Sequence, residues 1–172
     1  MSYNPEIPRN RYDNYGDREW TRLERDAHGE LLYHVHSDIL HRHIKPSDSV
    51  FEIGAGSGRY TKDIAKMCKE LTVADISSHQ IEFNKSKMKE LGLYDHIKDF
   101  LILDVVNMSA IESKSFDCVV CVGGVINYLL DKEQDGLEEM LRVLKPGGTL
   151  ILGSMSFIGA SLFYLDGIRY EK

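Results

Sequence analysis

Short hydrophobic runs alternate with amphipathic segments over most of this chain. The runs have the length of strands buried on both faces and lie at residues 49–53, 71–74, 100–103, 118–122 and 149–152. Between them, helical spacing or helix-end signals occupy residues 60–69, 77–92 and 131–144. Strands that alternate with helices build βαβ units. The pattern therefore predicts an α/β fold with a doubly wound, mostly parallel sheet and helices on both faces.

Polar residues at the element ends give the expected boundaries. Ser77 or Ser78 is expected to cap the second of these helices, which Gly92 ends, and Asp131 is expected to cap the third. Residues 1–18 show no periodicity and are expected to be irregular. Residues 19–44 read as one helix, because hydrophobic residues recur at helical spacing at Leu32, Val35 and Ile39.

The turn cluster at residues 46–48 suggests a division of the chain. Residues 1–45 are expected to form an N-terminal helical lid segment, and residues 46–172 the α/β domain. A length of 172 residues suits one such domain.

Net charge and the positions of the cysteines indicate which partners and which cellular location to expect. The formal net charge of −6 argues against nucleic acid as the main partner. Cys68, Cys118 and Cys121 lie in hydrophobic stretches, which suggests reduced thiols and a cytoplasmic location. Cys118 and Cys121 have CxxC spacing, but residues three apart on a strand point to opposite faces. No hydrophobic run has the length of a signal peptide core or a membrane span, so no membrane partner is expected.

A glycine-rich turn carries the sharpest chemical signal. Residues 50–59 read VFEIGAGSGR, a strand followed by GxGxG and the start of a helix. Glycines allow tight turning and let a ligand approach the backbone where a side chain would collide. Several nucleotide-binding proteins use such a turn, so this motif alone does not identify the ligand.

Acidic residues at the ends of the next two strands make the ligand more specific. Asp75 follows Gly58 by seventeen residues and is suited to accept hydrogen bonds from both hydroxyls of a ribose. Asp104 ends the third strand, where it can meet the exocyclic amino group of a purine while Val105 packs on the ring. The structural alternatives are a capping or solvent-facing aspartate at position 75 and a loop aspartate at position 104.

Together these motifs resemble the class I S-adenosylmethionine-dependent methyltransferases over roughly residues 49–153. The stretch LRVLKPGGTL at residues 141–150 is typical of the helix and turn before strand five in that family. The resemblance implies a Rossmann-like fold, S-adenosylmethionine as methyl donor and S-adenosylhomocysteine as product. It also implies that residues 117–128 flank the transferred methyl. The donor-binding residues expected within the α/β domain are Glu52, Gly54, Ala55, Gly56, Gly58, Asp75, Ile76, Asp104, Val105 and Gly123.

A nicotinamide-dependent oxidoreductase is the competing class. Its fingerprint places the third glycine one position later, and it has no counterpart of the LKPGG turn. A pyrophosphate would also be repelled by Glu52, whereas the donor's ammonium group would be attracted to it, directly or through water.

The segment after strand four bears on the methyl acceptor. It lacks the [DN]PP[YF] motif of methyltransferases that act on amino groups of DNA bases or glutamine, so a small-molecule acceptor is expected. Asn127 and Tyr128 are candidates for ordering the acceptor, with packing or capping as the equal alternative. No residue stands out as a general base, and the catalytic residues stay unknown at this point.

Two features lie before the first strand. In relatives a segment there folds over the donor, which makes Tyr12 and Tyr15 candidates for donor contact, with surface packing as the alternative. The histidines at positions 28, 34, 36, 41 and 43 share no common helix face, because positions two apart point about 200° apart. They predict a solvated or partly packed helix and no metal site.

The chain carries five predicted strands, without the C-terminal strands that relatives usually add. Residues 157–165 are strongly hydrophobic. An unprotected sheet edge there favours pairing of two copies into a homodimer. Because these strands are missing from the pattern, a second function is also considered: a donor-binding module without activity of its own.

Overall fold

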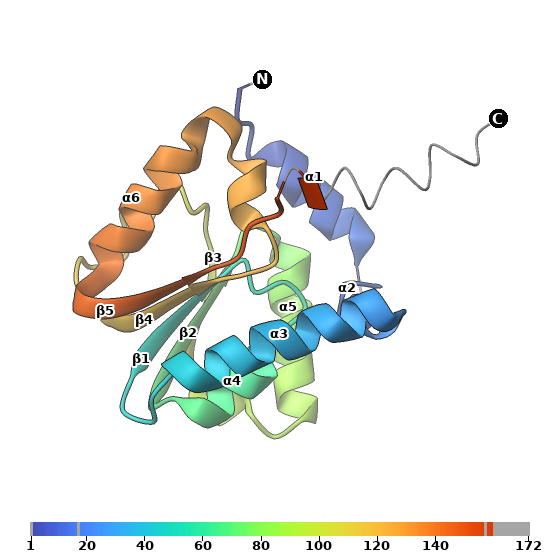
Figure 1. Cartoon of the computed structure of the whole chain (residues 1–172), viewed down its shortest axis with the longest axis horizontal. Helices are drawn as coiled ribbons and strands as arrows, with labels where there is room; N and C mark the ends of the chain where they lie inside the picture. Colours follow the sequence, from blue (N-terminus) through green and yellow to red (C-terminus); the bar gives the residue numbers. More distant parts are fainter. Residues whose placement is uncertain (1, 17, 157, 160–172) are drawn as a thin grey trace.

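One five-stranded parallel sheet forms the centre of the molecule, in the order β3-β2-β1-β4-β5 (Figure 1). The structure is a computed structural model and describes residues 2–16, 18–156 and 158–159. The strands are β1 (Ser49–Ile53), β2 (Glu70–Asp75), β3 (Ile97–Ile102), β4 (Phe116–Cys121) and β5 (Leu144–Leu152). Strand order reverses between β1 and β4, where parallel sheets of this kind open a crevice at the carboxyl ends of the strands.

Helices cover both faces of the sheet, as the sequence predicts. The three helices α3 (Ala27–His43), α4 (Thr61–Met67) and α5 (Ser78–Glu90) pack on one face, and α6 (Glu133–Val143) packs on the other. Leu40, Ile64 and Ile81 belong to the core cluster of the first face. Met140 and Phe51 belong to the core cluster of the second. Short 3-10 turns connect these elements: η2 (Tyr94–His96), η3 (Val125–Tyr128) and η4 (Leu130–Lys132).

All five predicted strands are present, but β3 and β5 begin three or more residues earlier than expected. Strand β3 begins at Ile97, where exposed Lys98 and Asp99 interrupt the hydrophobic run because this is an edge strand. Strand β5 begins at Leu144 and runs through Pro146, so the proline-glycine turn lies inside the strand with a shift of register against β4. Hydrophobic content alone therefore missed the polar beginnings of both strands.

The helix caps were predicted with mixed success. Ser77 caps α5, because its side chain accepts a hydrogen bond from the Gln80 backbone N–H. The expectation for Asp131 is wrong: it lies in η4, and Lys132 occupies the N-cap of α6. The Asp131 carboxylate accepts instead from the backbone N–H of Tyr3, at 2.6 Å. A contact with the far end of the chain thus replaces the local cap.

The N-terminal region differs most from the prediction. Within residues 1–18, expected to be irregular, α1 (Glu6–Tyr15) is a helix. It carries no hydrophobic stripe, so its periodicity gave no signal. The predicted helix over residues 19–44 is split into α2 (Arg18–Thr21), η1 (Arg22–Glu24) and α3. The break occurs where Asp26 caps α3 by accepting from the Gly29 backbone N–H, at 2.8 Å.

Two smaller expectations can also be compared with the fold. Cys118 and Cys121 belong to the core clusters of opposite sheet faces, as strand geometry predicts. The predicted buried face of α3 is only partly correct, because Val35 and Ile39 are exposed and Leu40 is buried.

Apart from residues 158–159, the hydrophobic stretch at 157–165 lies outside the described residues. No helix in the described part of the chain combines the length and hydrophobicity needed to span a bilayer.

Candidate functional site

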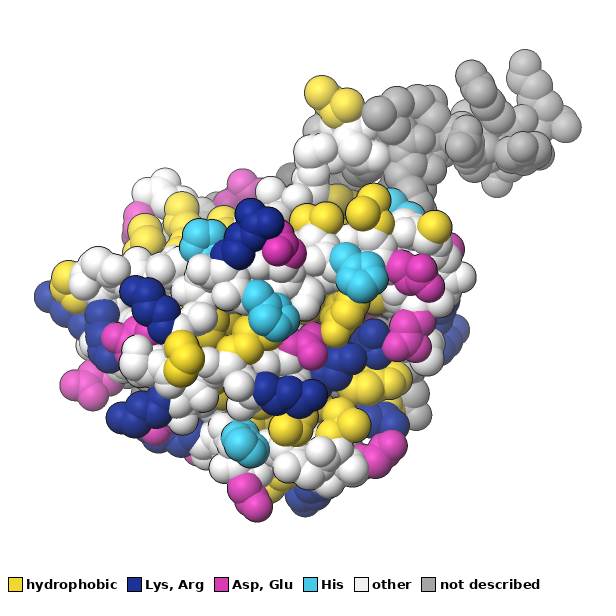
Figure 2. All heavy atoms as spheres, turned by 60° about the horizontal axis from the view of Figure 1, so that its bottom comes forward, with side chains coloured by type: hydrophobic (Ala, Val, Ile, Leu, Met, Phe, Trp, Pro, Cys, Tyr) yellow, Lys and Arg dark blue, Asp and Glu magenta, His cyan; other side chains and the backbone are white. Residues whose placement is uncertain are grey.

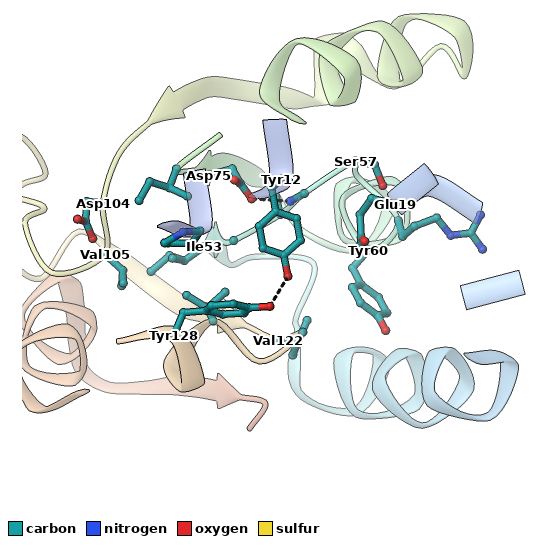
Figure 3. A pocket seen from close by; sticks show the side chains of 18 of the residues that line it. Tyr12, Glu19, Ile53, Ser57, Tyr60, Asp75, Asp104, Val105, Val122 and Tyr128 are labelled. Carbon is teal, nitrogen blue, oxygen red and sulfur yellow. Dashed lines mark hydrogen bonds between the residues drawn. The ribbon is translucent and has the colours of Figure 1, made fainter. Parts of the chain in front are cut away.

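A cavity lies at the carboxyl ends of the strands, between the sheet and the N-terminal helices (Figure 3). The space between its walls is about 910 Å³, which includes space open to solvent. The predicted residues that line it are Gly54, Ala55, Gly56, Asp75, Ile76, Asp104, Val105, Gly123, Tyr12 and Tyr128. Glu52, Gly58, Tyr15 and Asn127 were also predicted to be site residues and are not among its lining residues.

The glycine turn requires glycine for steric reasons. Gly54 has a φ of +68°, and a Cβ at this position would lie only 2.2 Å from Cγ2 of Val125. Gly58 has a φ of +94°, and its Cβ would lie 2.5 Å from Oδ1 of Asn84. Gly54 thus brings the turn after β1 against the segment after β4, whereas Gly58 lets the turn pack against α5.

Asp75 ends β2 with its carboxylate at the wall of the cavity. Oδ2 accepts from the Gly56 backbone N–H at 2.8 Å, and Oδ1 accepts from the Ser77 backbone N–H at 2.9 Å. Burial raises the pKa of Asp75 to about 6, although these two hydrogen bonds favour the charged form. The carboxylate is therefore held rigidly, with lone pairs left for ligand hydroxyl groups.

Glu52 takes a different position from the one that the sequence suggests. Its side chain is 2% exposed and accepts from the Thr61 hydroxyl at 2.6 Å. Asn84 donates to the same hydroxyl at 3.0 Å, so the group ties β1 to α4 and α5. Burial raises the pKa of Glu52 to about 8, and the carboxyl is mostly protonated at neutral pH. An attraction between a charged Glu52 and the donor's ammonium group is not favoured by this arrangement.

Asp104 and Val105 end the cavity beyond β3. One carboxylate oxygen of Asp104 accepts from the Tyr3 hydroxyl at 2.9 Å and from the Val106 backbone N–H at 3.1 Å. Val105 is buried in the core cluster beneath. The second carboxylate oxygen of Asp104 thus offers a polar contact at this end of the cavity. The side chain of Val105 offers an apolar contact at the same end.

Helix α1 lies across the cavity and is attached mainly to residues next to Asp75. The Gln80 side chain donates to the backbone oxygens of Tyr12 and Gly16, at 3.1 and 3.0 Å. Arg9 donates to the Ile76 backbone oxygen at 3.4 Å, and the Asp13 carboxylate accepts from the Ser77 hydroxyl. We call residues 2–24, which comprise α1, α2 and η1, the cap.

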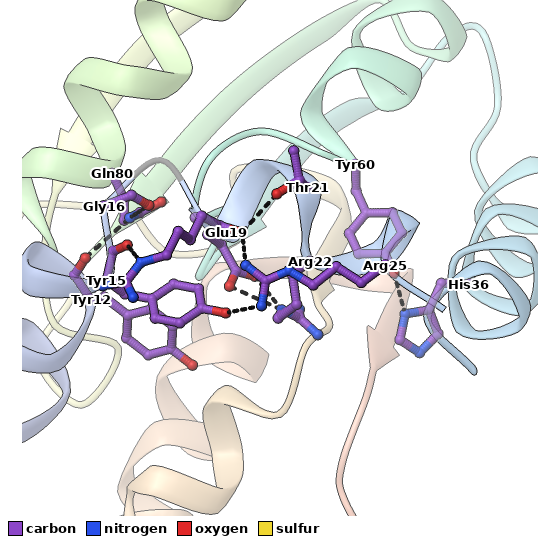
Figure 4. A network of polar contacts seen from close by, with 12 residues as sticks. Tyr12, Tyr15, Gly16, Glu19, Thr21, Arg22, Arg25, His36, Tyr60 and Gln80 are labelled. Carbon is purple, nitrogen blue, oxygen red and sulfur yellow. Dashed lines mark hydrogen bonds and ion pairs between the residues drawn. The ribbon is translucent and has the colours of Figure 1, made fainter. Parts of the chain in front are cut away.

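An ion pair on the cap faces the cavity and was missed by the sequence analysis. Nε of Arg22 donates to both carboxylate oxygens of Glu19, at 2.8 and 2.9 Å (Figure 4). Both residues line the cavity. Opposite charges three residues apart within a helical segment were the available signal. Tyr15 lies beside this pair, but its hydroxyl accepts from Arg25 at 3.3 Å and is not part of the lining.

Tyr60 was also missed, and it connects the cavity to α3. Its hydroxyl lies 2.8 Å from Nδ1 of His36, and its ring stacks on Tyr33 at a centroid distance of 5.8 Å. Burial raises the pKa of Tyr60 to about 12, so the phenol is neutral at physiological pH. Burial lowers the pKa of His36, and the nearby Arg22 lowers it further.

The structure separates the two acceptor candidates. The Asn127 side chain donates to the Met155 backbone oxygen at 3.2 Å and accepts from the Met155 N–H at 2.8 Å. These two hydrogen bonds hold the segment after β4 against the segment after β5, which corresponds to the packing alternative for Asn127. Tyr128 instead faces the cavity, where its hydroxyl lies 3.2 Å from that of Tyr12.

The histidines of the N-terminal helix serve separate local contacts. Nδ1 of His36 forms a hydrogen bond with the Tyr60 hydroxyl, whereas Nδ1 of His41 lies 2.8 Å from the Ser37 backbone oxygen. Figure 2 shows histidine side chains standing apart from one another on one face of the molecule. Within the described residues, no group of three or more His, Cys, Asp or Glu side chains is placed to hold a metal ion.

A doubly wound sheet with a glycine turn and two acidic strand ends defines a nucleoside-binding class of protein. Comparison with known proteins identifies the family within this class. Residues 51–152, more than half of the chain, match the family described as a methyltransferase domain. The chain therefore belongs to this methyltransferase family.

Individual relatives agree with this assignment. The chain is 31% identical over 134 residues to Nodulation protein S of Rhizobium tropici, covering 77% of this chain and 51% of the relative. It is 29% identical over 112 residues to the ubiquinone/menaquinone biosynthesis C-methyltransferase UbiE of Haemophilus ducreyi, covering 63% of this chain and 42% of the relative. The chain thus spans about half the length of these curated relatives.

A solved structure matches most of the fold. The N-methyltransferase NodS from Bradyrhizobium japonicum, in complex with S-adenosyl-L-homocysteine, superimposes with a TM-score of 0.67 and 26% identity. The match covers 86% of this chain and 71% of that structure. The Rossmann-like methyltransferase fold expected from the sequence is therefore confirmed.

Proposed function

We propose that this chain binds S-adenosylmethionine in the cavity and transfers its methyl group to a small-molecule acceptor. The observation that carries the proposal is Asp75, a carboxylate fixed by two backbone N–H groups at the cavity wall, directly against the glycine turn. Two fixed acceptor atoms suit the two hydroxyls of a ribose. Family membership and the S-adenosyl-L-homocysteine complex of NodS support the same ligand.

The other lining residues suit the remaining parts of the donor. Asp104 offers an acceptor to the adenine amino group, and Val105 offers an apolar surface to the ring. At the opposite end, the Glu19–Arg22 ion pair matches the amino acid end of the donor. Glu19 complements its ammonium group and Arg22 complements its carboxylate.

The cap encloses the donor in this proposal. The lid suggested by the sequence over residues 1–45 is better limited to the part of the cap before Leu23, because Leu23, Leu40 and Ile44 all belong to the core cluster. Enclosure excludes water and holds acceptor, methyl and sulfur in line. Methyl transfer from a sulfonium is a direct displacement, so alignment supplies much of the rate acceleration.

Assembly and location are further parts of the proposal. Strand β5 is an edge of the sheet, and Val35, Ile39 and Leu152 are exposed beside it. An open edge with exposed apolar residues favours pairing with a second copy. Cys68, Cys118 and Cys121 are free thiols, as expected for a cytoplasmic protein.

Calorimetry tests the donor assignment. S-Adenosylmethionine and S-adenosylhomocysteine are titrated into the purified chain, with a nicotinamide dinucleotide as control. Micromolar binding of the two sulfur nucleotides alone supports the proposal, and preferential binding of the dinucleotide contradicts it. Turnover with a panel of small amines, alcohols, phenols and carbon acids then separates an active transferase from a donor-binding module.

A further inference from the structure

Two tyrosine hydroxyls from distant parts of the chain meet in the cavity. Tyr12 comes from α1 and Tyr128 from η3, 116 residues later, and their oxygens are 3.2 Å apart (Figure 3). The rings meet edge to face, with centroids 5.9 Å apart and an interplanar angle of 73°. The backbone of Tyr12 is fixed by Gln80, so this contact joins the cap to the segment after β4.

The position of this pair along the cavity is informative. In Figure 3, Asp75 and Asp104 lie on one side of the pair, and Glu19 and Tyr60 lie on the other. The donor's nucleoside and amino acid ends are assigned to these two sides under the proposed function. Its sulfonium lies between those ends in the covalent structure. The two hydroxyls are therefore next to the sulfur and its methyl group.

The Tyr12 phenol is suited to hydrogen bonding and not to proton abstraction. Burial raises the pKa of Tyr12, and its hydrogen bond with Tyr128 raises it further, so this phenol is neutral at physiological pH. Tyr12 is placed to donate to Tyr128. This leaves the Tyr128 hydrogen and a lone pair on each oxygen unused, so the pair offers one donor and two acceptors to a third polar atom.

Resting on the donor site proposed above, we propose that Tyr12 and Tyr128 together position the acceptor's nucleophilic atom, and that this atom is nitrogen or oxygen. An oxygen atom has two lone pairs, one to accept from Tyr128 and one to attack the methyl carbon, and its hydrogen can be donated to Tyr12. An amine nitrogen has one lone pair, which attacks the methyl carbon, while its hydrogens can be donated to the two tyrosine oxygens. A carbon nucleophile without a polar hydrogen leaves the two hydroxyls without a third partner in a closed site, which is unfavourable.

The transfer balances without a further reactant. A lone pair of the acceptor atom forms the new bond to the methyl carbon, and the carbon–sulfur bond breaks with its electron pair remaining on sulfur. The positive charge moves from sulfur to the acceptor atom, which then releases its proton to water. Tyr12 and Tyr128 only hold the atom in line, so they are positioning residues until contact with the acceptor is measured.

A donor analogue tests this placement without knowledge of the acceptor. Sinefungin carries an amine on carbon in place of the methylsulfonium, so its ammonium group projects where the methyl group would be. S-Adenosylhomocysteine has no such group. Affinities of both analogues are measured by calorimetry for the wild type, Tyr12→Phe, Tyr128→Phe and the double variant. Tyr15→Phe is the matched control, because its hydroxyl is on the same helix and outside the cavity lining.

The expected result is selective. Each single variant loses about tenfold or more in affinity for sinefungin, because the ammonium group donates to a lone pair on each phenol oxygen, and less than about twofold for S-adenosylhomocysteine. The double variant loses less than the product of the two single effects, because the hydroxyls act as one unit. Thermal melting confirms that each variant is folded.

Other outcomes overturn the inference. Equal losses for both analogues, or no loss for either, mean that the hydroxyls do not face the methyl position. Turnover of a carbon nucleophile that is unaffected by Tyr128→Phe contradicts the acceptor class. If neither analogue binds the wild-type chain, the proposed function itself fails, and the inference fails with it.

Discussion

The two walls of the cavity are built in different ways. The sheet wall holds Gly54, Gly56 and Asp75 at the ends of buried strands, and backbone N–H groups fix the Asp75 carboxylate. The cap wall presents Tyr12, Glu19 and Arg22, which are only partly buried and which contact other side chains. The sheet wall therefore forms together with the core, whereas the cap wall depends on contacts between side chains and is anchored in the core by Leu23.

The two walls are therefore expected to respond differently to substitution. Substitutions in the sheet wall are expected to change both ligand affinity and folding stability. Substitutions in the cap wall are expected to change affinity alone, and by less.

The largest effect is expected for Asp75→Ala. Losing this buried partner costs about 1–3 kcal/mol, or roughly five- to more than a hundredfold in affinity for S-adenosylhomocysteine, measured by calorimetry. The variant should also melt at a lower temperature, because two backbone N–H groups lose their acceptor. Asp75→Asn is the control for size. A smaller affinity loss than that of the cap variants would reverse the comparison.

The second prediction concerns stability and pH. Burial raises the pKa of Glu52 from 4.5 to about 8, so the folded state keeps a proton that the unfolded chain releases. Its stabilising contribution is complete below pH 4.5 and is lost as the pH rises through about 8. Thermal melting at pH 5, 7 and 9 should show declining wild-type stability and a flatter profile for Glu52→Gln. The exposed Glu30→Gln should keep the wild-type profile. A Glu52→Gln profile as steep as that of the wild type would contradict the prediction.

A smaller effect is expected for Arg22→Gln in the cap wall. The Arg22–Glu19 pair is partly exposed, so solvent weakens its electrostatic interactions. The affinity for S-adenosylhomocysteine should fall about two- to tenfold with an unchanged melting temperature. Arg25→Gln serves as the neighbouring control, because Arg25 contacts Tyr15 outside the cavity. A large drop in melting temperature for Arg22→Gln would show that the cap is part of the folding core.

The smallest effect is expected for Tyr3→Phe. Its hydroxyl orients Asp104 through one hydrogen bond of 2.9 Å in a partly exposed position. Loss of such a bond should weaken S-adenosylhomocysteine binding by about twofold, at the low end of hydrogen-bond effects. Competition calorimetry against wild type has the precision for this comparison. Tighter binding by the variant would instead mean that Tyr3 competes with the donor for Asp104.

The sequence predicted the sheet wall because local spacing determines it. A strand, a glycine turn and a helix place Gly54 and Gly56 at the carboxyl end of β1 whatever the rest of the chain does. The acidic end of β2 then follows from the next βα unit. All five strands and the lining positions of Asp75 and Asp104 could be predicted for this reason.

The cap wall could not be predicted in the same way, because long-range contacts determine it. Helix α1 has no hydrophobic stripe, and its position depends on Gln80, more than sixty residues away in sequence. The pairing of Tyr12 with Tyr128 joins residues that no local pattern relates. Glu52 shows another limit: the sequence predicts a ligand contact at this position, whereas in the structure its side chain is buried and accepts from the Thr61 hydroxyl.

The contact between Tyr3 and Asp131 also constrains the order of events during protein synthesis. The cap leaves the ribosome before its anchor at Asp131, which is 128 residues further along the chain. At a translation rate of about 5–20 residues per second, the two ends of this contact are made roughly 6–25 s apart. Throughout that interval the nascent cap lacks this anchor, although its contacts with Gln80 become available earlier. Completion of the cap is thus a late step in the synthesis of each molecule, after strands β1 to β4 have been made.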